Sequence, residues 1–265
     1  MPDLRIAIAG LGAIGAVVAR RLDAGIPGLA LTAVATREPA KAAALKGQPV
    51  VAPFADLPAY ADVVVEAAPA AVFRQIAQPA IASGRLFLPL SVGALLSHLD
   101  LVDLARQTGA RILPPTGALL GLDAVRAAAE GTIHSVRMVT RKPPAGLKGA
   151  PHLEANAISL DGLDAPLKVF EGSAREAAIG FPANVNVAAA LSLAGIGPDR
   201  TMVEVWADPT VTRNTHRIEV DADSTRFSML IEGVPSPDNP RTGMLTPLSV
   251  IAALRGLVEP LKVGT

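Results

Sequence analysis

Three glycines near the N-terminus, Gly10, Gly12 and Gly15, have the GxGxxG spacing that suits phosphate binding. They follow the aliphatic segment Leu4–Ala9 and precede the apolar stretch AVVARRL, so the order predicts a buried strand, a tight turn and a helix. In such a turn the glycines make the bend, admit a pyrophosphate and let helix and strand pack, while the helix N-terminus attracts the phosphates. We therefore predict a dinucleotide site, against the alternative of a glycine-rich turn without a ligand. Its predicted contact residues are Gly10, Leu11, Gly12, Ala13, Ile14 and Gly15.

The end of the second predicted strand, residues 29–36, bears on which dinucleotide is bound. Folds that prefer NAD place Asp or Glu there, about 20 residues beyond the glycines, on the 2′-hydroxyl of the ribose. Here the strand ends at Thr36 and Arg37 follows it, so the acid is missing. These two side chains suit a 2′-phosphate, unless Arg37 is a solvated loop charge. The sequence therefore predicts NADP or NAD as the cofactor, with NADP favoured.

The second half of the chain contains the candidates for acid–base chemistry. Of the four histidines, none forms an i, i+4 pair and there is no cysteine, so we expect no metal site. His216 stands near the start of a predicted strand, after Asn214 and Thr215. A neutral imidazole with an ordinary pKa of about 6.5 suits proton transfer at physiological pH. The alternative is that His216 is a structural histidine.

Polar residues elsewhere in the second half have both a structural and a functional interpretation. Asn184 and Asn186 flank the start of a predicted helix, where they could cap it or reach the cofactor. Basic side chains such as Arg141 could hold the carboxylates of a dicarboxylic acid, or could be surface charges. The predicted substrate-binding residues are Arg141, Lys142, Asn214, Arg241 and Thr242, with Lys148 as a further candidate.

Repeated strand–helix alternation over the first 117 residues predicts a doubly wound parallel sheet of the Rossmann type. Ligands of such sheets bind at the carboxyl ends of the strands. Two polar or small-residue turns follow predicted strands at residues 62–67 and 86–90, and a helix is expected from the second turn to about Thr108. The cofactor contacts predicted in these turns are Ala67, Ala68, Ser91, Val92 and Gly93.

The pattern changes after Gly131, where an alternating strand at 132–141 is predicted. Residues 145–165 read as a loop, Ser173 as the N-cap of a short helix, and residues 184–194 as a further helix. Three strands are expected at 201–207, 214–221 and 226–232. The fold class is thus α/β: a Rossmann domain over 1–117 and an α+β catalytic and dimerisation domain over 118–242, with a mainly antiparallel sheet. A C-terminal helix within 243–265 is expected to pack back on the Rossmann domain.

Composition excludes several classes of function. The 24 basic and 24 acidic residues among 265 cancel, so no electric field favours nucleic acid or a membrane surface. No apolar run approaches the ~18 residues of a transmembrane helix, and the first strand follows Met1 too closely for a signal peptide. With no cysteine, these features lead us to expect a cytoplasmic protein that has neither a nucleic-acid nor a membrane partner.

A series of motifs resembles the L-aspartate dehydrogenase family, in order and over nearly the whole chain. The stretches are GLGAIG, SVGAL at Ser91–Leu95, TGALLGLDA at Thr116–Ala124, RKPP at Arg141–Pro144, EGSAREAAIGFPANVNVAAALSLAG at Glu171–Gly195, ADP…NTHRIEV from Ala207 to Val220, and VPSPDNPRT at Val234–Thr242. The resemblance implies NAD(P)-dependent oxidative deamination of L-aspartate to oxaloacetate and ammonia through iminosuccinate, or the reverse. It also implies that the enzyme is a homodimer or a larger homo-oligomer.

The resemblance assigns the catalytic role to His216 of the N-x-H motif, and cofactor contacts to Ala118 and Asn186. Two departures leave alternatives open. The second strand ends without an acid, and Gly243 stands where family members often have serine. The alternatives are a dehydrogenase or reductase of another small amino, imino or keto acid, and a non-catalytic NADP(H)-binding protein on the same fold.

Overall fold

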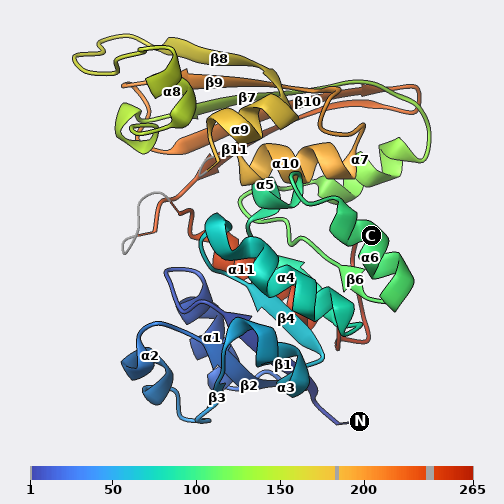
Figure 1. Ribbon diagram of the computed structural model, residues 1–265. Coiled ribbons are helices and arrows are strands. Elements are labelled where there is room, and N and C mark those ends of the chain that lie inside the picture. The colour runs from blue at the N-terminus through green and yellow to red at the C-terminus, as the bar shows by residue number, and fades with distance from the viewer. Residues whose placement is uncertain (1, 183–184, 237–241, 265) are drawn as a thin grey trace. The chain divides into compact units, whose positions relative to one another are not determined.

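The computed structural model describes residues 2–182, 185–236 and 242–264, which form two compact units (Figure 1). Unit 1 contains residues 2–117 and Thr246–Val263, and unit 2 contains Ala118–Leu245 with Gly264. Unit 1 is therefore made of an N-terminal and a C-terminal segment, with unit 2 between them in the sequence.

Unit 1 is built around a six-stranded parallel sheet in the order β3-β2-β1-β4-β5-β6. Its strands are β1 (Leu4–Ala9), β2 (Leu29–Ala35), β3 (Val50–Val51), β4 (Val63–Glu66), β5 (Leu86–Pro89) and β6 (Arg111–Ile112). The strand order reverses at β1, which pairs with β2 on one side and with β4 on the other. Ligands of such sheets bind beside the carboxyl ends of the strands at this reversal. The sheet confirms the predicted Rossmann fold.

Helices cover both faces of this sheet, because successive side chains of a strand point to opposite faces. Ile6 and Ile8 of β1 pack in one apolar cluster with α1 and α11, whereas Ala7 and Ala9 pack in another with α3, α4 and α6. The helices around this sheet are α1 (Gly15–Asp23), α2 (Pro39–Ala43), α3 (Leu57–Tyr60), α4 (Phe73–Ala82), α5 (Val92–Leu95), α6 (Asp100–Thr108) and α11 (Leu245–Arg255), with short 3₁₀ turns at Phe54–Asp56 and Ala70–Val72.

Unit 2 contains a five-stranded sheet in the order β11-β10-β7-β9-β8. Its strands are β7 (Ile133–Lys142), β8 (Leu167–Ser173), β9 (Thr201–Ala207), β10 (Asn214–Ala222) and β11 (Arg226–Gly233). The pair β7 and β9 is parallel and the other three pairs are antiparallel. This confirms the predicted α+β unit with a mainly antiparallel sheet.

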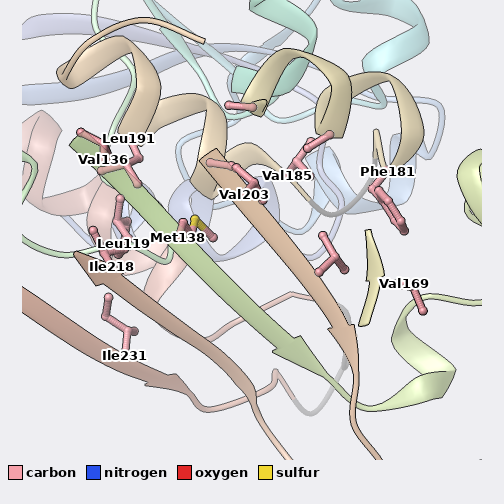
Figure 2. Packing of buried hydrophobic residues seen from close by; sticks show 14 of the residues in the cluster. Leu119, Val136, Met138, Val169, Phe181, Val185, Leu191, Val203, Ile218 and Ile231 are labelled. Atoms are coloured by element: carbon pink, nitrogen blue, oxygen red, sulfur yellow. The ribbon is translucent and has the colours of Figure 1, made fainter. Parts of the chain in front are cut away.

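One face of this sheet is covered by helices (Figure 1). They are α7 (Leu122–Ala129), α8 (Pro151–Ala155), α9 (Ala174–Gly180) and α10 (Asn186–Ala194), and a 3₁₀ turn lies at Pro144–Gly146. Figure 2 shows Met138, Val203 and Ile218 from three neighbouring strands in the core below the helices, with Leu191 of α10 in the same cluster. The other face carries charged side chains such as Arg217, which is exposed.

Several elements differ from the sequence prediction. The single helix expected up to Thr108 is two helices, because Ser97 N and His98 N bond carbonyls three residues back and the chain turns before Asp100. The prediction also lacks α7, β3 and β8, and α8 lies in the segment expected to be loop. β8 has the sequence LKVFEGS, whose charged residues obscure a strand at the edge of the sheet. The expected Ser173 cap of α9 is confirmed, with its side chain accepting from Glu176 N.

Candidate active site

The glycine turn after β1 is shaped by close packing at two of its three glycines. Gly10 has a φ of +102°, and a Cβ there would stand 2.6 Å from the carbonyl oxygen of Ala67. A Cβ on Gly15 would stand 1.9 Å from the carbonyl oxygen of Gly10. Around Gly12, in contrast, no atom lies within 4 Å of the Cβ position. The first and third glycines are thus required by the fold, whereas Gly12 leaves open space above the turn.

The N-terminus of α1 faces this turn without a capping side chain. Its N-cap residue is Ile14, which makes no side-chain cap, and the first turn of the helix holds no acid. Ala16 N and Val17 N already donate to the carbonyls of Gly12 and Ile14, at 3.0 Å each, so what the helix end offers an anion is chiefly the positive end of its dipole. The open space over Gly12 together with this helix end fits the pyrophosphate of a dinucleotide.

The loop after β2 presents a cation and no unpaired acid. Thr36 Oγ1 accepts a hydrogen bond from Glu38 N at 3.0 Å. The carboxylate of Glu38 is engaged by Lys41, with 2.7 Å between Oε1 and Nζ. Arg37 is exposed, and no ion pair of its guanidinium occurs within the part of the chain that the structure describes. The carboxylate of Glu38 is therefore paired with a lysine, and Arg37 is exposed beside it.

The turns after β4 and β5 are joined by Glu66, which the sequence analysis did not identify. This carboxyl is completely buried at the end of β4. It accepts hydrogen bonds from Ala68 N, Leu90 N, Ser91 N and Ser91 Oγ, at 2.9–3.1 Å. Burial raises the pKa of Glu66, and the hydrogen bonds, led by that from Ser91 N, oppose this rise. Glu66 thus holds together two turns that were predicted to contact the cofactor; Val92 and Gly93 follow Ser91 in the first turn of α5.

His216 is buried in the sheet of unit 2, with 3% of its surface exposed. It lies on β10 between Thr140 of β7 and Ile231 of β11. Its Nδ1 is 3.1 Å from Thr140 Oγ1. Burial, together with the charge of Lys142, lowers the pKa of His216 to about 3. The imidazole is therefore neutral at physiological pH and is oriented by the threonine, although its pKa lies well below the ordinary 6.5 expected from the sequence, which makes it a weaker base than a solvated histidine.

Lys142 lies on the same face of the sheet as His216. It comes two residues after Thr140 on β7, and side chains two apart on a strand share a face. Burial lowers the pKa of Lys142 to about 8. Asn214 begins β10 two residues before His216 and shares this face by the same rule. Three of the polar residues predicted from sequence, His216, Lys142 and Asn214, are therefore placed together by two paired strands.

Arg141 points to the opposite face of the sheet. Its Nη1 donates to Asp208 Oδ2 at 3.0 Å, and its guanidinium lies over the ring of Trp206, 4.6 Å from the ring centroid. Asp208 is buried and also accepts from the amide and hydroxyl of Thr210. The structure therefore brings Lys142 to the histidine and holds Arg141 in an ion pair elsewhere.

The other predicted residues of unit 2 lie at the starts of elements. Asn186 is the first residue of α10. Ala118 lies in the turn before α7, and a Cβ built on Gly243 would stand 4.0 Å from the Cβ of Ala118. Thr242 accepts a hydrogen bond from Ser236 N through its carbonyl. Asn184 and Arg241 lie outside the described residues. Their predicted contacts with cofactor and substrate stay predictions.

Among the residues that the structure describes, no group of three His, Asp or Glu side chains is arranged to hold a metal ion. No helix among them has the length and apolar character needed to cross a membrane.

The Rossmann sheet with its glycine turn, and the second unit with its buried histidine, define a two-domain NAD(P)-dependent oxidoreductase. The family model for "Aspartate dehydrogenase, C-terminal" matches residues 123–257, and that for "Homoserine dehydrogenase, NAD binding domain" matches residues 10–115. The chain is 61% identical to an L-aspartate dehydrogenase of Bradyrhizobium diazoefficiens, covering 99% of this chain and 95% of the relative. It is 54% identical to L-aspartate dehydrogenase 3 of Bordetella bronchiseptica, covering 99% and 98%. The chain belongs to the L-aspartate dehydrogenase family.

A solved structure supports the fold. The crystal structure of aspartate dehydrogenase from Thermotoga maritima matches with a TM-score of 0.73 at 24% identity, covering 99% of this chain and all of that one. The family model and the two relatives confirm the family resemblance inferred from the sequence motifs, and the solved structure supports the α/β fold.

Proposed function

We propose that the protein oxidatively deaminates L-aspartate to oxaloacetate and ammonia with NAD(P)⁺, or runs the reverse reductive amination. The observation that carries the proposal is the buried, neutral His216 beside Lys142, in a chain whose relatives at 61% and 54% identity are named L-aspartate dehydrogenases. In this proposal unit 1 binds the dinucleotide, with its pyrophosphate over Gly12, and unit 2 supplies the acid–base chemistry.

When bound, NAD(P)⁺ would be held by the turn of Gly10, Gly12 and Gly15 and would supply the hydride acceptor for Cα, the oxidation that converts the amino acid to an imine. The proposed task of His216 follows from its neutral imidazole: Nε2 accepts a proton from water as the water oxygen bonds to the imine carbon. The C=N π electrons move to nitrogen, which then takes the proton back from the His216 imidazolium. As the C–N bond breaks and ammonia leaves, the hydroxyl oxygen forms the C=O bond and its proton passes to the neutral imidazole. For Nε2 to be the free base, Nδ1–H must donate to Thr140 Oγ1, which is 3.1 Å away.

The first test follows the absorbance of reduced cofactor with purified protein, oxaloacetate and ammonium, using NADH and NADPH in parallel. Oxidation that requires ammonium is expected. Oxidation without ammonium would instead indicate reduction of a ketone. Rates with aspartate, glutamate, alanine and malate in the other direction test the amino acid, and a faster rate with any other than aspartate would contradict the proposed substrate.

The proposed role of Lys142 is to hold a substrate carboxylate, and this predicts a pH dependence. Its pKa of about 8 means that the ammonium is charged below pH 8 and loses its charge above it. Succinate, a dicarboxylate without an amino group, should inhibit competitively with a Ki that rises about tenfold per pH unit above the pKa of Lys142 in the free enzyme. Lys142→Arg keeps its charge at high pH and should flatten this rise. A wild-type Ki that stays constant from pH 7 to pH 10 would exclude Lys142 from this role.

We propose NADP(H) as the preferred cofactor, because Arg37 is exposed beside Thr36 and the neighbouring Glu38 is paired with Lys41. Arg37→Ala should raise the Kd of NADPH by roughly 10–100-fold, since hydrogen bonds to charged groups are worth ~1.5–3 kcal/mol. The Kd of NADH should change less than twofold. Titration of both cofactors by fluorescence measures this, and an equal change in both would remove Arg37 from the 2′-phosphate.

We further propose that the protein is a homodimer or a larger homo-oligomer, as the family resemblance implies. The sheet face opposite the helices of unit 2 is its candidate interface, because it combines exposed Met202 with charged residues such as Arg137 and Arg217. Light scattering that gave the mass of a single 27.1 kDa chain would contradict this proposal.

A further inference from the structure

We propose that Glu66 is a positioning residue that holds the nicotinamide half of the cofactor site in its binding shape. The inference rests on the proposed cofactor binding. It concerns unit 1 alone, and it assigns a task to a buried charged side chain that has no part in the proton transfers proposed above.

Every acceptor position of the Glu66 carboxylate has a donor. Oε1 accepts from Ala68 N at 3.0 Å and from Ser91 Oγ at 3.0 Å. Oε2 accepts from Leu90 N at 3.1 Å and from Ser91 N at 2.9 Å. A carboxyl group offers about four lone-pair sites, and these are faced by three N–H groups and by the Ser91 hydroxyl, which also lies 3.3 Å from the carbonyl oxygen of Ala68. No ion pair of Glu66 occurs among the described side chains, and the carboxylate is held by backbone and hydroxyl dipoles instead.

These donors come from two turns that lie at the carboxyl ends of adjacent strands. Ala68 follows β4, and Leu90 and Ser91 follow β5, which pairs with β4 in parallel. The hydroxyl of Ser91 donates to Glu66, and its side chain makes no capping bond to α5. A side chain that would ordinarily cap the helix is thus used to bind the two turns together.

The first of these turns also touches the glycine turn. Ala67 N donates to Ala9 O at 2.9 Å, and the carbonyl of Ala67 occupies the space that a Cβ on Gly10 would need. Residues 67–68 are therefore fixed on one side by the glycine turn and on the other side by Glu66. A shift of Glu66 would move this turn relative to Gly10, directly at the reversal of strand order.

The position in the sheet indicates which half of the dinucleotide would be affected. In this strand order the ribose of the adenosine half binds at the end of β2, on one side of β1. The turns that Glu66 holds lie on the other side, after β4 and β5. Loss of the carboxylate should therefore weaken contacts to the nicotinamide half and leave those to the adenosine half intact. A carboxylate with a general structural role would affect both halves alike.

The test compares Glu66→Gln with the wild type in two titrations, one with NADH and one with ADP, which lacks the nicotinamide nucleoside. Glutamine has the same shape, but its NH₂ group must face N–H donors where an oxygen accepts in the wild type. We expect the Kd of NADH to rise about tenfold or more, from the lost charged hydrogen bonds, and the Kd of ADP to stay within twofold. Isothermal titration calorimetry measures both constants.

Asp62→Asn is the matched control, because Asp62 precedes the same strand at its other end and pairs with Arg5. Both Kd values should be unchanged in this variant. If Glu66→Gln does not fold, Ser91→Ala removes one donor and should shift the two Kd values in the same unequal way, by less. Equal changes for NADH and ADP, or no change in either, would overturn the inference. A wild-type protein that binds neither of these nor NADPH would refute the proposed function itself.

Discussion

Replacing His216 with alanine should reduce turnover of aspartate by ~10²–10⁴-fold, the range that a positioned acid or base contributes. The imidazole is buried and lies 3.1 Å from Thr140 through its Nδ1, so its removal takes away the proposed base from a fixed position. The Kd of the reduced cofactor should change little, because unit 1 binds it in the proposal. Steady-state rates and a cofactor titration on the same preparation measure the two effects.

His216→Asn separates chemistry from packing in this experiment. Asparagine fills part of the space and can still bond Thr140, but it cannot accept a proton from water, so the loss should be as large as for alanine. His134→Ala, at an exposed histidine of β7, is the matched control and should keep wild-type turnover. Because the pKa of His216 is about 3, the wild type should show no loss of kcat/KM from this group between pH 5 and pH 8. Near-normal turnover in His216→Ala would exclude His216 as the base.

The structural elements that the sequence predicts correctly are those determined by residues adjacent in the chain. The glycine spacing, the aliphatic segment before it and the apolar helix after it are adjacent in the chain, so strand, turn and helix follow from short-range rules. The same holds for Ser173, whose capping of α9 needs only the residues of the next turn. Motifs of this length also carried the family resemblance.

Glu66 shows what short-range rules do not provide. Its partners Leu90 and Ser91 lie 24 and 25 residues further along, and they meet it only because β4 and β5 pair in parallel register. A signal was nevertheless present in the sequence. An acid that follows the apolar run VVV in a buried strand costs free energy unless it is satisfied, and it lies where the ligands of such sheets bind.

The difference between Arg141 and Lys142 has a similar origin. Strand alternation predicts that adjacent residues point to opposite faces, so one of the two cations had to point away from the face that the other shares with His216. Which one does so depends on the pairing of Thr140 with His216, 76 residues apart. Because one residue of slip exchanges the two faces of a strand, the choice needs the register, which the sequence alone does not determine.

Gly12→Ala should weaken cofactor binding without a loss of stability, whereas Gly15→Ala should first of all destabilise the fold. A methyl group on Gly12 meets no atom within 4 Å, so the free energy of unfolding should be unchanged. The methyl would instead occupy the space proposed for the pyrophosphate, and the Kd of NADH should rise at least tenfold, or ~1.4 kcal/mol. The melting temperature and the Kd of the purified variant measure both quantities.

Gly15→Ala is the counterpart, because its methyl group would stand 1.9 Å from the carbonyl oxygen of Gly10. Helix and strand must then move apart, and overpacking of this kind costs ~1–3 kcal/mol or more, so the melting temperature should fall by several degrees. Binding would be lost only as a consequence of the distorted turn. If Gly12→Ala bound NADH as tightly as the wild type, the pyrophosphate would have to lie away from the open side of this turn. Gly15→Ala tests the packing of the turn alone. If its melting temperature fell while Gly12→Ala bound NADH normally, the described packing would be supported and only the proposed place of the pyrophosphate would be wrong.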